Sequence, residues 1–359
     1  MCGIVGVWSS QIITDRDTGE RRLADMVSRI AHRGPDDRGV WFDGTVGLGH
    51  ARLAVIDLSD AAAQPMADVE GVVRVTYNGE IYNYRELRQQ LANLGHRFQS
   101  DSDTEVLVEG YKRWGINMLQ RFHGMFAFAL WDAGELRLFL VRDRIGKKPL
   151  YYTARGDTLV FASEIKAILA WPGTARSANL DAIHSYLTFQ YVPTPLTAFE
   201  GIHKLPPASY MAIEADGRSR TETYWSLPRP ETATPRPRRE IESELLGRFD
   251  DAVRRRMVSD VPLGAFLSGG IDSASVVATM AKVRRTRSRP SPSVSMTPTM
   301  TSGVMPGSFR RNTTRITMSS SCGRTPSRCC QNWSGIMASL LPIPRQSRLI
   351  ISASSRAPT

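Results

Sequence analysis

The sequence predicts a layered domain that combines strands and helices, of the α+β or α/β class. Short apolar stretches of strand length recur along the first half of the chain, and longer stretches with helical periodicity lie among them. The region from Cys2 to about residue 215 is long enough to bury one substantial core. Propensity alone does not choose the topology of the sheets.

The individual elements follow from the spacing of apolar residues. Strands are expected at Ile4–Trp8, Val46–Ile56, Val72–Tyr77, Met125–Trp131 and Leu136–Val141. Helices are expected at Tyr84–Leu94 and Thr104–Trp114, with Asp103 or Thr104 as the cap of the second helix. A stretch rich in Pro and Arg follows over Leu227–Arg239, and a further helix is expected from Glu240 to about Val258.

A second kind of motif begins at residue 261. An apolar strand is expected over Val261–Leu267, a S-G-G-I-D-S turn follows over Ser268–Ser273, and a helix is expected over Ala274–Ala281. In this order the glycines let backbone N–H groups approach an anion, and the helix N-terminus adds a favourable dipole. A Ser-Gly-Gly turn taken alone is more often an ordinary loop, and the G-x-x-x-x-G-K phosphate motif is absent here.

Cys2 is the candidate nucleophile. Removal of Met1 would leave a cysteine that carries both a thiol and a free α-amine. An α-amine titrates at about 7.7–8.0 and a thiol at about 8.5, so the amine can take the thiol proton near neutral pH. The alternative is that Cys2 is a small apolar residue that opens a core strand.

Further motifs carry a family resemblance. They are R-G-P-D at Arg33–Asp36, G-H-A-R-L-A-V-I-D at Gly49–Asp57, Y-N-G-E-I-Y-N at Tyr77–Asn83 and S-D-T-E at Ser102–Glu105. With them the chain resembles the class II glutamine amidotransferases. R-D-R-I-G-K-K-P-L-Y-Y at Arg142–Tyr152, together with S-G-G-I-D-S, narrows the resemblance to glutamine-hydrolysing asparagine synthetases, from Cys2 to about Lys282.

The resemblance implies both a fold and a domain organisation. The expected fold is a four-layer αββα sandwich of the N-terminal-nucleophile type, followed by the beginning of a doubly wound α/β ATP-pyrophosphatase domain. The glutaminase domain is expected over residues 2–215, a linker over 216–239, the start of the ATP-pyrophosphatase domain over 240–283 and a tail over 284–359.

Three residues take catalytic roles by this resemblance. Cys2 attacks the side-chain amide carbonyl of glutamine, and the tetrahedral oxyanion needs hydrogen-bond donors already in place. Asn78 and Gly79 match the family positions that supply them, through a side-chain amide and a backbone N–H.

Three more residues suit the zwitterionic end of glutamine. Arg52 suits the carboxylate because of its forked geometry, and Asp103, helped by Glu80, suits the ammonium group. His32 and His50 lie near these motifs, and we interpret both as structural because the α-amine already serves as the base.

The S-G-G-I-D-S turn resembles the pyrophosphate-binding loop of ATP pyrophosphatases. By resemblance Leu267 contacts the adenine, while Asp272 helps to place Mg²⁺ or, as the plain alternative, caps the helix. The expected ATP-binding residues are Leu267, Ser268, Gly269, Gly270, Asp272 and Ser273. No metal-ligand spacing of His or Cys is present.

The implied activity is ATP-dependent amidation of aspartate to asparagine, with ammonia supplied by glutamine hydrolysis and with AMP and pyrophosphate released. The chain as written holds the first site and only the entrance of the second, so we expect glutaminase activity at most. Two alternatives stay open: a related amidotransferase with another acceptor, of the polysaccharide-cluster or β-lactam-forming type, and an inactive pseudogene product. An amidotransferase of phosphoribosyl or sugar-phosphate type is disfavoured because the S-G-G-I-D-S turn indicates adenylation.

The end of the chain has a different composition. No Asp or Glu occurs in the 87 residues after Asp272, and chance would produce such a gap about once in 10⁵ chains. Of the 77 residues from Val283 to Thr359, 45 are Ser, Thr, Pro or Arg. The formal charge of +11 arises there, since Met1–Asp272 holds 33 Lys and Arg against all 35 acids, a charge of −2. Without aromatic interleaving or a groove-reading pattern, the basic tail is no argument for nucleic-acid binding.

A frameshift explains this tail. If the reading frame is displaced by one nucleotide, Met300-Thr301 encodes Asp, Met305-Pro306 encodes Ala and Met337-Ala338 encodes Gly. The displaced strings look like the continuation of the synthetase domain. We therefore place a one-nucleotide shift, real or a sequencing error, between about Lys282 and Thr301; the alternative is a disordered basic tail.

The location and partners follow from what the sequence lacks. No apolar run has membrane-spanning length, and the N-terminus has no signal-peptide pattern, so a cytoplasmic enzyme without membrane contact is expected. The expected partners are the small molecules glutamine, aspartate and ATP, with assembly as a homodimer left open.

The frameshift is tested by resequencing the source DNA over codons 275–305. We expect one nucleotide to be gained or lost relative to the frame that encodes the family pattern. If the corrected frame restores acidic residues after Asp272, the basic tail does not exist in the cell. If resequencing instead reproduces the printed frame, and family-like residues occur only in the displaced frame, the gene itself carries the frameshift.

Overall fold

The computed structural model describes residues 1–228, 236–266 and 270–286. Its first sheet, sheet 1, has six antiparallel strands. In spatial order they are β10 (His203–Lys204), β8 (Tyr151–Arg155), β9 (Thr158–Ala162), β1 (Gly3–Ser9), β3 (Val46–Arg52) and β2 (Asp37–Phe42). The first strand of the chain is therefore central, between β9 and β3, and every residue of β1 is buried.

Sheet 2 is also antiparallel and six-stranded. In spatial order its strands are β12 (Ser219–Thr223), β11 (Ser209–Ile213), β7 (Arg137–Arg142), β6 (Gly124–Asp132), β5 (Val73–Ile81) and β4 (Met66–Ala67). Strands β5 and β6 form its longest pairing, from Val73 opposite Asp132 to Ile81 opposite Gly124.

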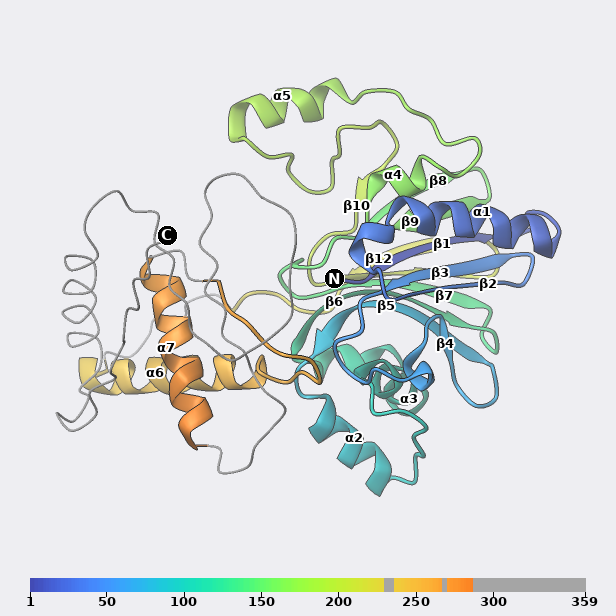
Figure 1. Ribbon diagram of the computed structural model, residues 1–359. Helices are drawn as coiled ribbons and strands as arrows, with labels where there is room; N and C mark the ends of the chain where they lie inside the picture. Colours follow the sequence, from blue (N-terminus) through green and yellow to red (C-terminus); the bar gives the residue numbers. More distant parts are fainter. Residues whose placement is uncertain (229–235, 267–269, 287–359) are drawn as a thin grey trace, which may run out of the picture. The chain divides into compact units, whose positions relative to one another are not determined.

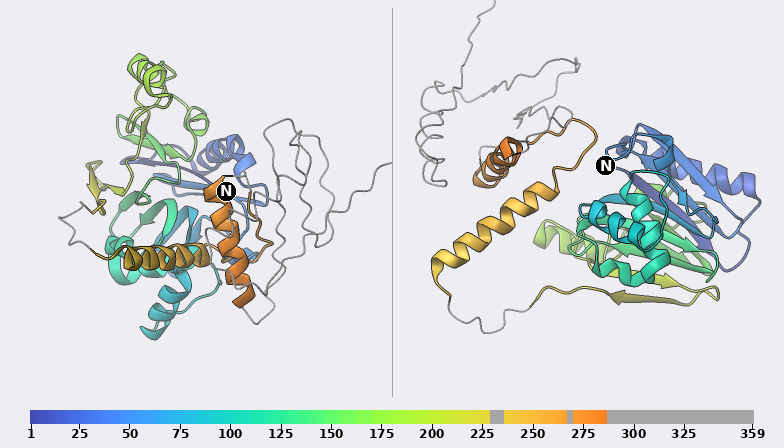
Figure 2. Two further views of the ribbon diagram at one scale, coloured as in Figure 1. Left: turned by 90° about the vertical axis from the view of Figure 1, so that its left-hand side faces the viewer. Right: turned by 90° about the horizontal axis from the view of Figure 1, so that it is seen from below.

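Helices cover the outer face of each sheet (Figure 1). Helices α1 (Arg16–Arg29) and α4 (Ile165–Ile168) lie on sheet 1, and α2 (Tyr84–Asn93) and α3 (Asp103–Trp114) lie on sheet 2. The order helix, sheet, sheet, helix is the αββα sandwich that the family resemblance implies. Helix α5 (Leu180–Phe189) stands away from the sandwich in Figure 1 and in the left view of Figure 2.

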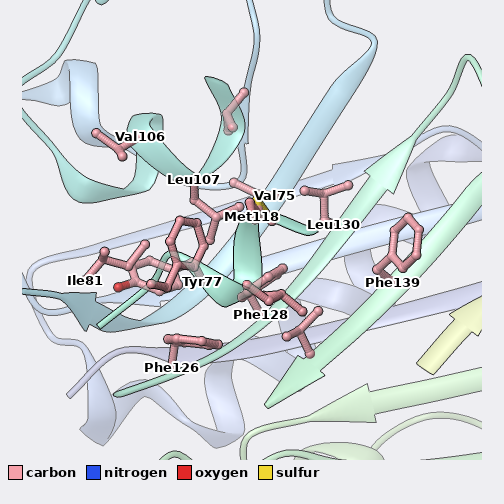
Figure 3. Packing of buried hydrophobic residues seen from close by; sticks show 14 of the residues in the cluster. Val75, Tyr77, Ile81, Val106, Leu107, Met118, Phe126, Phe128, Leu130 and Phe139 are labelled. Carbon is pink, nitrogen blue, oxygen red and sulfur yellow. The ribbon is translucent and has the colours of Figure 1, made fainter. Parts of the chain in front are cut away.

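Three separate apolar cores hold the four layers together. One, between α1 and sheet 1, includes Leu23, Met26 and Phe42. The middle core joins the inner faces of the two sheets, and the third packs α2 and α3 onto sheet 2. Figure 3 shows part of this third core, where Leu107 lies near Val75 and Met118. Each face of each sheet is thus covered, which explains the near-continuous apolar runs in β1 and β6.

The strands and helices expected in the first half of the chain are confirmed, with two differences at strand ends. Strand β3 ends at Arg52 rather than at Ile56, because the next backbone groups bond elsewhere: Leu53 N–H to Cys2 Sγ and Ala54 N–H to Asp36. Strand β5 continues to Ile81, because β6 pairs with it along its whole length.

The expected cap of α3 was wrong by one residue. Ser102 is the N-cap, with extended backbone angles, and its hydroxyl accepts the N–H of Glu105. The two candidate residues are engaged elsewhere: the Asp103 carboxylate accepts bonds from β5, and the Thr104 hydroxyl accepts one from Gln64. A serine followed at N3 by a glutamate is the sequence signature of this arrangement.

The strand expected over Val261–Leu267 was also wrong for its described part. Residues 261–266 form no ladder with any residue that the structure describes, and Leu267 lies outside the described residues. A strand of a parallel sheet requires neighbours to accept its backbone hydrogen bonds. The helix before this stretch, α6 (Arg238–Arg255), lies within three residues of its expected bounds, whereas α7 (Ile271–Thr286) begins three residues earlier and ends five residues later than expected. The tail expected from residue 284 lies outside the described residues beyond 286.

None of the helices in the described ranges is long and apolar enough to cross a membrane.

Replacing Ser102 with Ala tests the cap. The variant leaves the Glu105 N–H without its acceptor, and the loss of such a cap costs about 1 kcal/mol of unfolding free energy. Denaturant unfolding of the full chain measures it. The control Ser28→Ala removes an exposed hydroxyl inside α1 and is expected to stay within about 0.5 kcal/mol of the parent. Equal losses for the two variants would contradict the capping role.

Candidate active site

Cys2 directly precedes β1. At this edge of the sandwich it lies next to the end of β3, the neighbouring strand. Its thiol is half-buried and exchanges two contacts with Leu53: the Leu53 N–H donates to Sγ at 3.4 Å, and the thiol faces the Leu53 carbonyl oxygen at 3.6 Å. Burial raises the pKa of the Cys2 thiol, and the Leu53 backbone contact opposes this rise. Stabilising the thiolate therefore depends on nearby positive charge and donors.

Asn78 and Gly79 lie side by side on β5 in sheet 2. The Asn78 side chain is only 1% exposed, and neither its Oδ1 nor its Nδ2 has a hydrogen-bond partner among the described residues. A buried amide without partners costs free energy, so its presence favours a ligand that completes its bonds. A side chain at Gly79 would place its Cβ 2.5 Å from the Met125 carbonyl oxygen, so only glycine fits this close approach of β6.

Glu80, near the end of β5, and Asp103, the first residue of α3, form an acidic pair. The Asp103 carboxylate is 5% exposed and accepts the Tyr77 hydroxyl at 2.8 Å and the Ile81 N–H at 2.9 Å. Burial raises the pKa of Asp103, and these two bonds oppose the rise. Burial, followed by the charge of Asp103, also raises the pKa of the half-buried Glu80. Both carboxylates would gain from a cation between them.

Arg52 ends β3 with its guanidinium 6% exposed. It donates to the Ser59 carbonyl at 3.0 Å and to the Asp57 carbonyl at 2.5 Å, and so holds the loop that follows the strand. Asp57 has a φ of 50°, a left-handed conformation that its side-chain bonds to Ser59 and Asp101 stabilise. A guanidinium carries five N–H groups, so donors remain for a bound carboxylate.

The two sheets bring these groups into one region. Cys2 and Arg52 come from sheet 1, whereas Asn78, Gly79 and Glu80 come from sheet 2. Asp103, at the start of α3, is near enough for its charge to act on the Cys2 thiol. The arrangement combines a thiol, a buried side-chain amide without partners among the described residues and groups of both charges.

The comparisons with known proteins agree with this geometry. A family model described as a glutamine amidotransferase domain matches residues 1–225, and a model described as asparagine synthase matches residues 244–307. The chain belongs to the glutamine amidotransferase domain family. The asparagine synthase match extends past Lys282, where our sequence resemblance ends.

Curated relatives are also similar to this chain. Asparagine synthetase [glutamine-hydrolyzing] 1 of Bacillus subtilis (strain 168) is 37% identical over 277 residues, which is 77% of this chain and 43% of the relative. Amidase chry2 of Gibberella zeae is 38% identical over 71% of this chain and 38% of the relative. The chain spans less than half the length of these two relatives.

Among solved structures, the glutamine phosphoribosylpyrophosphate amidotransferase from B. subtilis, complexed with ADP and GMP, aligns over 62% of this chain and 49% of its own. The alignment has 23% identity and a TM-score of 0.46.

The two histidines near the site have different environments in this amidotransferase domain. His50 is fully buried in β3, and its Nε2 lies 3.1 Å from the Tyr77 carbonyl oxygen. Burial lowers the pKa of His50 to about 4, so the imidazole is neutral and donates this bond. His32 is largely exposed and lies 2.9 Å from Glu164. Both have partners that suit a structural role.

The sequence reasoning missed two cations near Cys2. Arg33 Nε donates to the Cys2 carbonyl at 2.9 Å, and its Nη1 donates to Glu164 at 2.8 Å. Lys148 is the second omission, since it is 4% exposed and its charge acts on the Cys2 thiol. Arg33 and Lys148 lie in two of the motifs that carry the family resemblance, but no role was assigned to them. Their place in these motifs is the signal that could have identified them.

The predicted ATP-binding residues fall partly outside the described ranges, as Leu267, Ser268 and Gly269 do. Gly270, Asp272 and Ser273 lie at the start of α7, where the Ser273 hydroxyl donates to the Gly270 carbonyl at 3.1 Å. Within the described part of the chain no group of three His, Cys, Asp or Glu side chains is placed to hold a metal ion.

His50 predicts a pH dependence of stability. The unfolded imidazole titrates near 6.5, whereas the folded one stays neutral until about pH 4. The unfolded chain therefore binds a proton at His50 more strongly than the folded chain. The free energy of unfolding falls as the pH drops from about 6.5 to 4, and His50 contributes about 3 kcal/mol to this fall. Denaturant unfolding of the parent and of His50→Gln at pH 7, 5.5 and 4 measures the difference in slope.

The control for this experiment is His184→Gln, which removes an exposed imidazole on α5. Its stability should follow the parent at all three pH values. A parent and a His50→Gln variant with parallel pH profiles would contradict the assigned neutral state of His50.

Proposed function

We propose that this chain hydrolyses glutamine through a thioester at Cys2. The observation that carries the proposal is the Asn78 amide, which is buried and has no partner among the described residues, on the strand that faces the nucleophile. Together with the Gly79 N–H it would bind an oxyanion. The membership of residues 1–225 in the glutamine amidotransferase domain family supports the choice of glutamine.

The reaction begins with proton transfer within the first residue of the processed chain. Once Met1 is removed, the Cys2 α-amine takes the thiol proton and the thiolate attacks the glutamine side-chain carbonyl. Burial lowers the pKa of the amine at the chain start, carried by Met1 in the structure, and this favours its neutral, basic form. The negative charge moves to the carbonyl oxygen, which accepts bonds from Asn78 Nδ2 and the Gly79 N–H.

Collapse of the tetrahedral intermediate completes the first half of the reaction. The α-amine returns its proton to the leaving nitrogen, ammonia departs and the acyl group stays on Cys2 Sγ as a thioester. Water then attacks the thioester carbonyl, with the same amine as base, and glutamate leaves with the thiol restored.

Recognition of glutamine uses the charges around the nucleophile. In this proposal Arg52 binds the α-carboxylate through its remaining N–H groups, and Asp103 and Glu80 bind the ammonium group. The ammonium would reverse the rise in the pKa of both carboxylates, because an adjacent cation favours the charged form. A neutral amide without these charges would leave the three side chains uncompensated.

We also propose that the chain represents a glutamine-hydrolysing asparagine synthetase whose second half is incomplete. The asparagine synthase match over residues 244–307 and the relatives named asparagine synthetase support this proposal. ATP would supply an adenylate leaving group for aspartate, with Mg²⁺ at its phosphates. Of the residues expected to hold ATP, the structure describes Gly270, Asp272 and Ser273.

A different acceptor is the second candidate. The relative named Amidase chry2 is as similar to this chain as the relatives named asparagine synthetase are, at 38% against 37% identity. The residues that would choose the acceptor lie beyond the glutaminase domain, so the Cys2 chemistry is common to both candidates.

Glutaminase assays of the full chain test the proposal. The parent should release glutamate and ammonia, Cys2→Ala should release none, and Asn78→Ala should lose a factor of about 10²–10³ in kcat because one oxyanion donor is removed. The control Asn93→Ala alters an exposed asparagine at the end of α2 and should keep the parent rate. Equal rates for the parent and Cys2→Ala would contradict the nucleophile, and asparagine formed from aspartate and ATP would contradict the incomplete second half.

A further inference from the structure

Lys148 is a buried cation without a counter-ion. Its residue is 4% exposed, yet its ammonium group makes no hydrogen bond or ion pair with any residue in the described ranges. Lysine is rarely buried unless it is paired, because an ammonium group loses its hydration there. Its neighbour Lys147 is exposed, so burial is specific to one of two adjacent lysines.

The backbone of Lys148 is fixed beside the strand that carries the oxyanion donors. Its N–H donates to Asp143 Oδ2 at 2.9 Å, and the same oxygen accepts the Phe126 N–H at 3.2 Å. Phe126 is the residue of β6 that pairs with Gly79 of β5. The loop after β7 is thereby attached next to Gly79.

Arg142 holds the other side of this loop. Its guanidinium donates to the carbonyl oxygens of Lys148 at 2.8 Å, Gly146 at 2.9 Å and Leu205 at 2.6 Å. With both its N–H and its carbonyl bonded, the backbone of Lys148 is fixed in this loop.

The surroundings of Lys148 show which groups feel its charge. Burial lowers the pKa of Lys148, while the negative charges of Glu80 and of the Cys2 thiolate oppose this. The charged groups acting on Cys2 are the chain's α-amine, Asp103 and Lys148; those acting on Lys148 are Glu80, Cys2, Arg33 and Asp143. Lys148 is thus the side-chain cation that favours the thiolate.

Arg33, the other cation near Cys2, has its charge balanced by Glu164, although its Nη2 is buried without a hydrogen-bond partner among the described residues. Two of its nitrogens are occupied by the Cys2 carbonyl and by Glu164. Glu80 acts on Lys148 through its charge but forms no ion pair with it, since no nitrogen–oxygen distance within 4.0 Å joins the two side chains. The charge of Lys148 therefore remains available to the reacting sulfur.

We propose that Lys148 is a positioning residue whose fixed positive charge stabilises the Cys2 thiolate. The proposal rests on the proposed glutaminase function. Before attack the thiol proton moves to the Cys2 α-amine and the sulfur bears the negative charge, which Lys148 balances in a site from which water is partly excluded; on attack this charge passes to the carbonyl oxygen.

The rate at which iodoacetamide alkylates Cys2 measures the thiolate directly, without glutamine. The full chain, with removal of Met1 verified by mass spectrometry, is compared with Lys148→Met, Lys148→Arg and Lys147→Met from pH 5.5 to 9.5. The modified N-terminal peptide is quantified because Cys322, Cys329 and Cys330 also react. We expect the midpoint of Lys148→Met to rise by about one pH unit, which slows alkylation about tenfold at pH 7.

The other variants separate charge from packing. Lys148→Arg keeps the charge and should stay within about threefold of the parent, and Lys147→Met should match it. In the glutaminase assay Lys148→Met should lower kcat by about the same factor as it lowers the alkylation rate, and the KM for glutamine should change little. If circular dichroism shows that Lys148→Met does not fold, Lys148→Gln takes its place.

Two outcomes overturn the proposal: an alkylation profile of folded Lys148→Met that matches the parent, or a loss confined to KM, which would make Lys148 a ligand of the substrate carboxylate. The glutaminase function fails on its own if the parent hydrolyses no glutamine. A shifted alkylation profile in that case still upholds the effect of Lys148 on the sulfur.

Discussion

The site depends on the polar contacts that fix sheet 1 against sheet 2. His50 of β3 donates to the Tyr77 carbonyl, and the Thr76 hydroxyl of β5 donates to the Gly49 carbonyl at 3.0 Å. Both bonds are fully buried in an otherwise apolar interface. Hydrogen bonds are directional, whereas apolar packing tolerates sliding. They therefore set the position of β5, which carries Asn78 and Gly79, relative to β3 and to Cys2, whose thiol bonds at the end of β3.

The fold was predictable where burial leaves a pattern in one segment. Strands β1, β6 and β7 are apolar runs because both faces of each sheet are covered, and they lie where the sequence predicts them. Strands β8 and β12 were not predicted, because they are half-exposed or exposed and carry mixed residues without alternation. Strands β9 and β11 were not predicted either, although they are almost wholly buried, because an apolar run of five residues carries too little periodicity. The stretch at residues 261–266 shows the reverse: it is apolar, yet a strand also needs a partner that local sequence does not reveal.

The candidate site divides in the same way. Cys2, Arg52, Asn78 and Asp103 stand in motifs whose resemblance assigns them roles. Lys148 and Arg33 stand in motifs too, but a cation is interpreted as a surface residue unless its burial is known. Burial of Lys148 arises from the Asp143 carboxylate and the Arg142 guanidinium, which fold the loop inward. Water is excluded from Lys148 but not from Lys147 only once the loop has folded. The spacing of residues in the sequence therefore does not show which of the two lysines is buried.

The unpaired charges of the site explain how it could select glutamine. Glu80 and Lys148 bear opposite charges close to Cys2, yet they form no ion pair. The side-chain amide of Asn78 has no hydrogen-bond partner among the described residues. An unoccupied arrangement of this kind raises the free energy of the folded chain, because each group has given up water without a full replacement. In the proposed reaction the Cys2 thiolate balances Lys148, and the substrate supplies the ammonium for Glu80 and the oxyanion for Asn78. A ligand that lacks any of them leaves a buried group unsatisfied, so discrimination arises from the same groups that perform the chemistry.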